Sequence, residues 1–108
     1  MAKAWLKRNF PAGTHFRMPL NYVVNHLSSY DKNKVLGRES SLFESWQSKK
    51  EKGICSILDN GVSPRSIEPI RMNIHLKREE FYVSDGISRI RAFRKKGIKS
   101  INTILGYY

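Results

Sequence analysis

Cysteine, acidic residues and long apolar runs are all scarce in this chain of 108 residues. Its single cysteine, Cys55, excludes an internal disulfide and a cysteine-rich zinc site. The histidines His15, His26 and His75 lack the spacing of metal ligands, so we expect no metal site. The N-terminal segment MAKAWLKRNFPAGTHF has no apolar run long enough for a signal peptide or a membrane span. We therefore expect a cytoplasmic protein with no membrane partner.

The shortage of acidic residues is the strongest feature of the composition. There are 9 Asp and Glu against 20 Lys and Arg, which gives a net charge of +11. No acidic residue follows Asp85, whereas six basic residues do: Arg89, Arg91, Arg94, Lys95, Lys96 and Lys99. Such an imbalance favours a polyanionic partner, nucleic acid or nucleotide, and a solvated basic face without a partner is the alternative. The 40% hydrophobic and 11% aromatic content argues for a folded chain.

The N-terminal half predicts a strand, a short helix and a long helix within one domain of residues 1–108. Residues 1–15 are expected to form a flexible N-terminal arm. FRMPL alternates apolar and polar residues and contains Pro19, which indicates a strand at a sheet edge, and PLNYVVNHL then has helical spacing. Residues 30–41 are rich in Ser, Asn, Asp and Gly, and we expect a surface loop there.

The long helix is predicted in SSLFESWQSKKEKGICSILDNG. Ser40 or Ser41 is suited to cap its start, and Asn60 with Gly61 to end it. Gly53 is a candidate break within the helix, and Trp46 is expected in the core.

The C-terminal half predicts a strand hairpin, a helix and a final strand. IRMNIHLK alternates strictly, KREE is suited to a turn, and FYVS is a second strand. ISRIRAFRKKG places apolar residues on one helical face and ends in Gly97, and IKSINTIL is a last strand. The fold class expected is therefore α+β, a single small domain with a mixed sheet flanked by helices.

The turn between the second strand and that helix is a candidate phosphate site. A glycine, Gly86, precedes the helix, so an anion can approach the free backbone N–H groups closely. Arg89 lies in the first helical turn, where its guanidinium can form two hydrogen bonds with phosphate oxygens. Arg91 can reach the same anion or the protein's own carboxylates. The structural alternative is a tight turn followed by solvated arginines.

The stretch DGISRIRAFRKKGIKSINTIL resembles the ParB N-terminal domain of the ParB/sulfiredoxin superfamily. In that family a strand leads into Gly-Glu-Arg-Arg-x-Arg-Ala, a helix, a glycine and a short strand. Gly86, Arg89, Arg91 and Ala92 stand at matching positions, and Glu68, Pro69 and Ile70 match the residues that open an earlier strand. The resemblance extends over most of the chain from about Phe16 and is weakest over residues 30 to 55.

This resemblance implies a ParB/sulfiredoxin-like fold that binds a nucleotide, DNA or both. The phosphate-binding residues would be Asp85, Gly86, Ser88, Arg89 and Arg91, and the ligand a nucleoside triphosphate such as CTP or ATP with Mg²⁺. The nucleic-acid contacts would be Arg94, Lys95, Lys96 and Lys99. These assignments suit a DNA-maintenance role in a plasmid or phage.

One departure from the motif bears on catalysis. The motif's glutamate is Ile87 here, so the carboxylate that family members use in nucleotide hydrolysis is absent and binding is favoured over hydrolysis. Glu68 is the remaining candidate base. Two alternatives stay open: a small ParB-like nuclease, and an inert interaction protein that retains the fold. Cys55 does not occupy the position of the sulfiredoxin cysteine, which disfavours redox chemistry.

Overall fold

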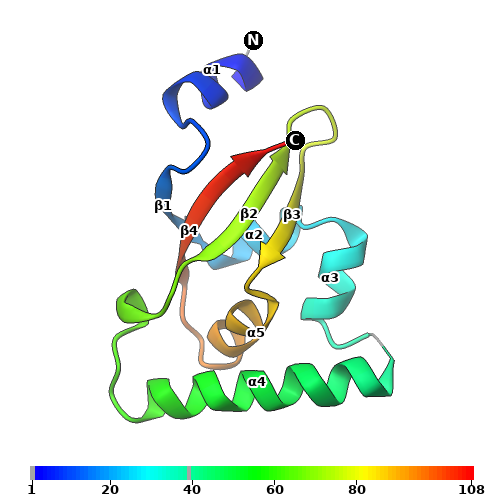
Figure 1. Cartoon of the computed structure of the whole chain (residues 1–108), viewed down its shortest axis with the longest axis vertical. Coiled ribbons are helices and arrows are strands. Elements are labelled where there is room, and N and C mark those ends of the chain that lie inside the picture. The colour runs from blue at the N-terminus through cyan, green and yellow to red at the C-terminus, as the bar shows by residue number, and fades with distance from the viewer. Residues whose placement is uncertain (1, 39) are drawn as a thin grey trace.

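A computed structural model describes residues 2–38 and 40–108 (Figure 1). Along the chain it contains α1 (Ala2–Asn9), β1 (His15–Pro19), α2 (Leu20–His26), α3 (Ser29–Val35), α4 (Ser41–Asp59), the 3₁₀ turn η1 (Pro64–Ser66), β2 (Ile70–His75), β3 (Glu80–Asp85), α5 (Ile87–Lys95) and β4 (Ser100–Tyr107). The four strands form one mixed sheet in the order β1-β4-β2-β3. The expected α+β class with a mixed sheet is confirmed.

The sheet combines both kinds of strand pairing. The hairpin β2–β3 and the pair β1–β4 are antiparallel, whereas β2 and β4 run parallel in the centre. The predicted positions of the strands, and of β1 at an edge, are confirmed. Because β1 is an edge strand, it pairs with β4 alone. Pro19, which has no backbone N–H to donate, is therefore tolerated at the end of β1.

One core joins the sheet to the helices α2, α3 and α5. Alternate residues of the central strands are buried, among them Met72 on β2 and Leu105 on β4. They pack in one cluster with three helical residues, Val23 of α2 and Ile90 and Phe93 of α5. Each of these three residues is at most 1% exposed. Figure 1 shows α4 lying across one end of the molecule, with α5 between it and the sheet. The basic helix α5 is therefore an inner element, in contact with both layers.

Two predictions for the N-terminal half differ from the structure. Helix α3 lies where residues 30–41 were expected to form a surface loop, because Ser28 caps it and Asp31 and Val35 share a buried face, each 4% exposed. The N-terminal arm of residues 1–15 contains helix α1, and Leu6 and Phe10 pack against the core. The hydroxyl of Tyr107 donates a hydrogen bond to the carbonyl oxygen of Phe10. These contacts anchor the segment to β4.

Helix α4 is continuous but is oriented differently from the sequence prediction. Gly53 does not interrupt its 19 residues, and Asn60 ends it as expected, followed by Gly61 at φ 91°. Trp46 was predicted in the core and is 53% exposed, whereas Gln47 is 5% exposed. The core prediction for Trp46 is therefore wrong, because in this part of α4 the side chains of Glu44, Gln47 and Glu51 face α5 instead.

Candidate functional site

The Asp85–Gly86 turn has a structural reason for its glycine. Gly86 has φ 125°, a backbone conformation that L side chains rarely adopt. A Cβ atom placed on it would lie 2.4 Å from the Cγ2 atom of Ile70, a fully buried residue of β2. The close approach of β2 to the start of α5 thus requires a glycine here even without a ligand.

Arg89 is held by the protein's own oxygen atoms. Its Nη1 donates to the carbonyl oxygen of Pro69 at 2.8 Å, and its Nη2 lies 3.2 Å from Oδ2 of Asp85 and 3.7 Å from Oε2 of Glu68. The side chain is 15% exposed. The structure therefore brings together three predicted site residues, Glu68, Asp85 and Arg89, and the arginine ties the turn to the segment before β2.

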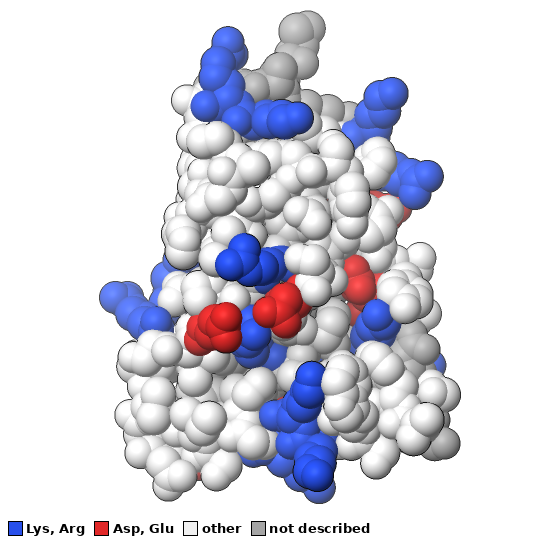
Figure 2. Space-filling model, viewed as in Figure 1, with Lys and Arg blue, Asp and Glu red and all other residues white. Residues whose placement is uncertain are grey.

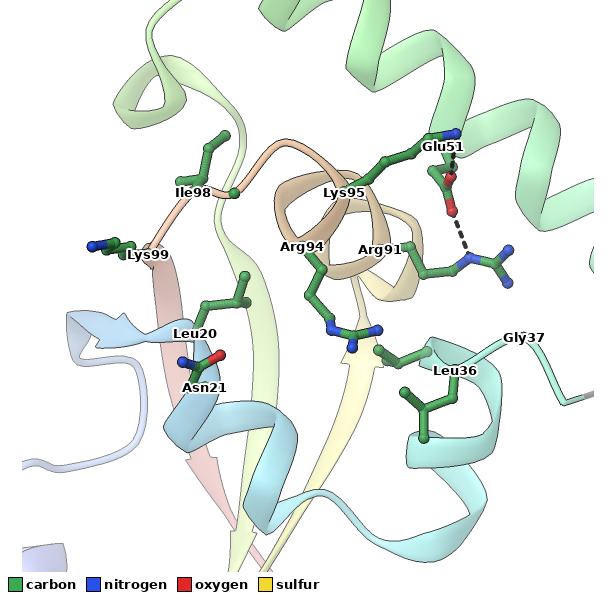
Figure 3. A pocket seen from close by; sticks show the side chains of 12 residues that line it. Leu20, Asn21, Leu36, Gly37, Glu51, Arg91, Arg94, Lys95, Ile98 and Lys99 are labelled. Atoms are coloured by element: carbon green, nitrogen blue, oxygen red, sulfur yellow. Dashed lines mark hydrogen bonds and ion pairs between the residues drawn. The ribbon is translucent and has the colours of Figure 1, made fainter.

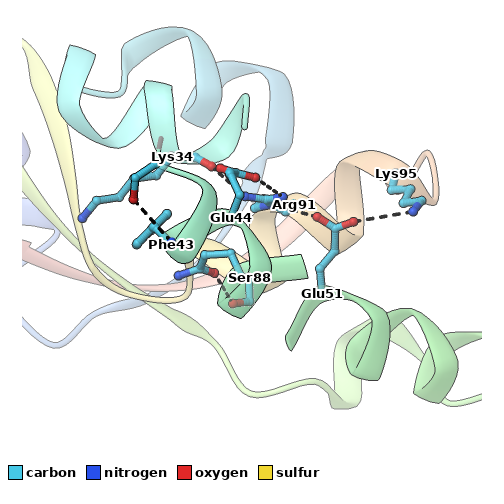
Figure 4. Close-up of polar contacts among 9 residues, drawn as sticks. Lys34, Phe43, Glu44, Glu51, Ser88, Arg91 and Lys95 are labelled. Carbon is cyan, nitrogen blue, oxygen red and sulfur yellow. Dashed lines mark hydrogen bonds and ion pairs between the residues drawn. The ribbon is translucent and has the colours of Figure 1, made fainter. Parts of the chain in front are cut away.

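Arg91 points away from the turn and lies between two carboxylates of α4 (Figure 4). Its Nε donates to Oε1 of Glu51 at 2.8 Å, its Nη2 lies 3.0 Å from Oε2 of Glu44, and its Nη1 donates to the carbonyl oxygen of Lys34 at 3.1 Å. Burial lowers the pKa of Arg91, but the hydrogen bonds and charges of the two glutamates outweigh it and raise the pKa above its ordinary value. The sequence left two partners open for Arg91, a bound anion or the protein's own carboxylates, and the structure shows the carboxylates.

Ser88, the next predicted phosphate ligand, also has a partner within the protein. Its hydroxyl donates to Oε1 of Gln47 at 2.6 Å. Ser88 and Arg91 lie one helical turn apart, and both bond to α4 at positions four residues apart, Gln47 and Glu51. The polar inner face of α4 is thus matched to α5 by specific hydrogen bonds.

A pocket of about 520 Å³ nevertheless opens beside the turn, between α4 and the start of α5. Four of the five predicted phosphate ligands line it: Asp85, Gly86, Ser88 and Arg89. Arg91 does not. Trp46, Lys50 and Lys34 line it as well. The sequence had predicted Trp46 in the core and gave the two lysines no role. The sequence does contain one signal for Trp46 and Lys50: they are four residues apart, which places both side chains on the same face of a helix.

Trp46 and Lys50 form a cation–π contact at the pocket. The Nζ atom of Lys50 lies 3.8 Å from the centroid of the Trp46 ring, and half of the Trp46 side chain faces solvent. A cation above an exposed indole is weakly held, at about 0.5–1 kcal/mol. The pocket therefore offers an aromatic face and an ammonium group that are both available to a ligand.

A second pocket of about 630 Å³ lies at the other end of α5, next to the start of α2 (Figure 3). Three of the four predicted nucleic-acid residues line it: Arg94, Lys95 and Lys99. Figure 3 shows the Arg94 side chain extending into the space between α5 and α3, and Lys95 turned towards Glu51. The Nζ atom of Lys95 lies 3.7 Å from Oε2 of Glu51.

The fourth of these residues, Lys96, lies apart from the pocket. It pairs with Asp59, and its pKa is raised, first by the hydrogen bond to that carboxylate. Four of the six basic residues after Asp85 are thus paired with acidic side chains, and in residues 2–38 and 40–108 Arg94 and Lys99 have no ion pair. Figure 2 shows the same contrast on one face, with acidic side chains gathered near its centre among basic ones and further basic side chains around them.

Comparisons of the chain with protein-family models, curated proteins and solved structures gave no match. The resemblance to the ParB N-terminal domain therefore stays a prediction. No group of three or more His, Cys, Asp or Glu side chains in the described part of the chain is placed to hold a metal ion. None of the helices in that part combines the length and apolar character needed to cross a membrane.

Proposed function

We propose that this protein binds nucleotides in the pocket between α4 and the Asp85–Gly86 turn. The observation that carries the proposal is the meeting of Trp46, Lys34 and Lys50 with four predicted phosphate ligands around one pocket. An exposed indole stacks on any nucleobase, at about 1–3 kcal/mol per base. The two lysines supply positive charge, and the first N–H groups of α5 have no intrahelical partners. Gly86, at the N-cap position, has no side chain to satisfy them.

The ligand proposed is a nucleoside triphosphate, CTP or ATP with Mg²⁺, as the ParB resemblance implies. Arg89 would keep its contacts with Pro69 and Asp85 and shape the wall of the pocket, while Lys34 and Lys50 would contact the phosphates. This differs from the arrangement expected from the sequence, in which Arg89 and Arg91 hold the phosphates. Binding is favoured over hydrolysis because Ile87 replaces the motif's glutamate and Asp85 is paired with Arg89.

DNA binding is the second candidate, and it depends on a different pocket. Arg94 and Lys99 are exposed and unpaired within the described residues, and both line the pocket at the end of α5. Free arginine and lysine side chains are the groups that contact the phosphate backbone of DNA. We propose that duplex DNA, if bound, contacts this end of α5.

The test is a calorimetric titration of the protein with CTP, ATP, GTP and UTP, with and without Mg²⁺. Trp46→Ala is expected to weaken binding about 5- to 150-fold, the equivalent of a lost stacking contact. Lys52→Ala is the matched control for Lys50→Ala, since Lys52 is an exposed lysine of α4 that does not line the pocket. Absence of binding at millimolar concentration for every nucleotide would refute the proposal.

A further inference from the structure

Three aromatic rings and two lysines lie in mutual contact along the surface formed by α3 and the first half of α4. The Nζ atom of Lys34 lies 3.9 Å from the centroid of the Tyr30 ring and 5.6 Å from that of Phe43. The rings of Phe43 and Trp46 lie edge to face with centroids 6.2 Å apart, and Lys50 lies over Trp46. Figure 4 shows Lys34 and Phe43 side by side. We call these five residues, Tyr30, Lys34, Phe43, Trp46 and Lys50, the aromatic-lysine strip.

Two of the three rings of the strip are exposed to solvent. Tyr30 is 65% exposed and Trp46 is 53% exposed, whereas the largest fully buried side chain of the core is Phe93. Core packing therefore does not explain the two rings at the ends of the strip. The strip is also continuous with the proposed nucleotide pocket, because Lys34, Trp46 and Lys50 belong to both.

We propose that the strip binds single-stranded nucleic acid, with bases stacked on Trp46 and Tyr30 and phosphates bound by Lys34 and Lys50. This inference rests on the proposed function, since it extends the nucleotide pocket to a second base. A single strand fits because its bases expose their faces, whereas a duplex keeps them stacked inside. The strip thus offers rings to the bases and ammonium groups to the phosphates of such a strand.

The lysines above the rings do not prevent stacking. An exposed cation–π contact corresponds to about a two- to fivefold effect on an equilibrium, and a base–aromatic stack to about 5- to 150-fold. A base would therefore displace the ammonium group from the ring. The displaced ammonium group of Lys34 or Lys50 would remain beside the base, where it can bind the neighbouring phosphate.

The charge of the surroundings favours nucleic acid over a protein as the occupant. A lysine lies over each of the two exposed rings, Lys34 over Tyr30 and Lys50 over Trp46. The chain as a whole has a net charge of +11. A docking surface for a protein is usually depleted in lysine at its centre. The strongly exposed Leu42 next to the strip is the feature that a protein partner would use instead.

The test is fluorescence anisotropy with a labelled oligothymidylate about 10 nucleotides long, a duplex of the same length, and thymidine triphosphate as competitor. The oligonucleotide is expected to bind more tightly than the duplex and the mononucleotide. Tyr30→Ala should weaken oligonucleotide binding about 5- to 150-fold and leave mononucleotide binding unchanged. Tyr30→Phe should retain full affinity, since it keeps the ring.

The matched control is Tyr108→Ala, because Tyr108 is 68% exposed but lies against His75 and Tyr82, outside the strip. Equal losses for Tyr108→Ala and Tyr30→Ala, or preference for the duplex, would overturn the inference. Mononucleotide binding without tighter oligonucleotide binding refutes the strip alone, whereas loss of both refutes the nucleotide pocket as well. Sedimentation that shows self-association abolished by Trp46→Ala would identify a second copy of the chain as the occupant and overturn the inference.

Discussion

Replacing Arg91 with methionine should destabilise the protein strongly while leaving nucleotide affinity intact. The Arg91 side chain is 9% exposed, and its partners Glu44 and Glu51 are 23% and 13% exposed. Removing one partner of a buried ion pair costs about 3–5 kcal/mol, because the remaining charge is left without compensation. The partial exposure of Glu44 places the expected loss at about 3 kcal/mol. The hydrogen bond to the carbonyl oxygen of Lys34 adds about 1 kcal/mol.

This loss is a large fraction of the 5–15 kcal/mol that stabilises a typical domain. The assay is urea unfolding followed by circular dichroism, with Arg94→Met as the matched control. Arg94 lies on the same helix, is exposed and lines the neighbouring pocket, so its replacement should change stability by no more than about 0.5 kcal/mol. Glu51→Gln in the Arg91→Met background should restore part of the loss, because it removes a buried charge whose remaining partner, Lys95, lies 3.7 Å away and is largely exposed.

Two outcomes would refute this reasoning. Equal destabilisation by Arg91→Met and Arg94→Met would mean that the contacts of Arg91 with α4 contribute little. Additive effects of Arg91→Met and Glu51→Gln would mean that the two side chains are not coupled, whereas contacting residues usually show a coupling of about 0.5–3 kcal/mol. A large loss of nucleotide affinity in the folded Arg91→Met protein would restore the phosphate role predicted from the sequence.

Two further predictions concern Gly86 in the turn before α5 and Tyr107 at the end of β4. Gly86→Ala should destabilise the protein by at least about 1–3 kcal/mol, because of the positive φ and the clash with Ile70. The control Gly53→Ala lies in open space within α4 and should stabilise the protein by about 0.5–1 kcal/mol; the urea midpoints of the two variants measure both effects. Desolvation raises the pKa of Tyr107, so the stability that its protonated hydroxyl contributes is present below about pH 10 and is lost as the pH rises through the raised value. Tyr107→Phe should therefore lose less stability than the wild type above pH 10 in thermal melts, and identical pH profiles would contradict this explanation.

The elements that the sequence predicted correctly are those whose signals are local. Strict alternation marks β2, turn residues mark the hairpin to β3, and Gly97 with φ 71° marks the end of α5. Each of these features is decided by neighbours within a few residues. Local periodicity is therefore enough to recover the strands and the basic helix.

Helix α3 was missed because its stabilising contact is distant in the sequence. The Oδ2 atom of Asp31 accepts a hydrogen bond from the backbone N–H of Val83 at 2.9 Å, and 52 residues separate the two. An Asp in a run rich in Ser and Asn favours a loop prediction, since such residues also form turns. No local pattern distinguishes a buried Asp31 from a solvated one.

The inner face of α4 was assigned wrongly for a related reason. Hydrophobicity favours burial of Trp46 and Leu42, but α5 presents Ser88 and Arg91 to α4, and these require Gln47 and Glu51 opposite them. The choice of face thus depends on another helix about 40 residues away in the chain. The aromatic face near the pocket could not be predicted before that pairing was known.

The position of β4 in the centre of the sheet has a consequence for folding. Residues 100–107 fill the gap between β1 and β2, and β1 has β4 as its neighbour in the sheet. Until this segment pairs, the chain can form the β2–β3 hairpin but leaves β1 without a partner strand. Ile101 and Leu105 then have not yet covered the apolar residues that they contact in the finished core. Until β4 docks, the folding chain therefore carries open, aggregation-prone sheet edges, and chaperone capture during that interval is expected to matter more than for a protein whose neighbouring strands are adjacent in sequence.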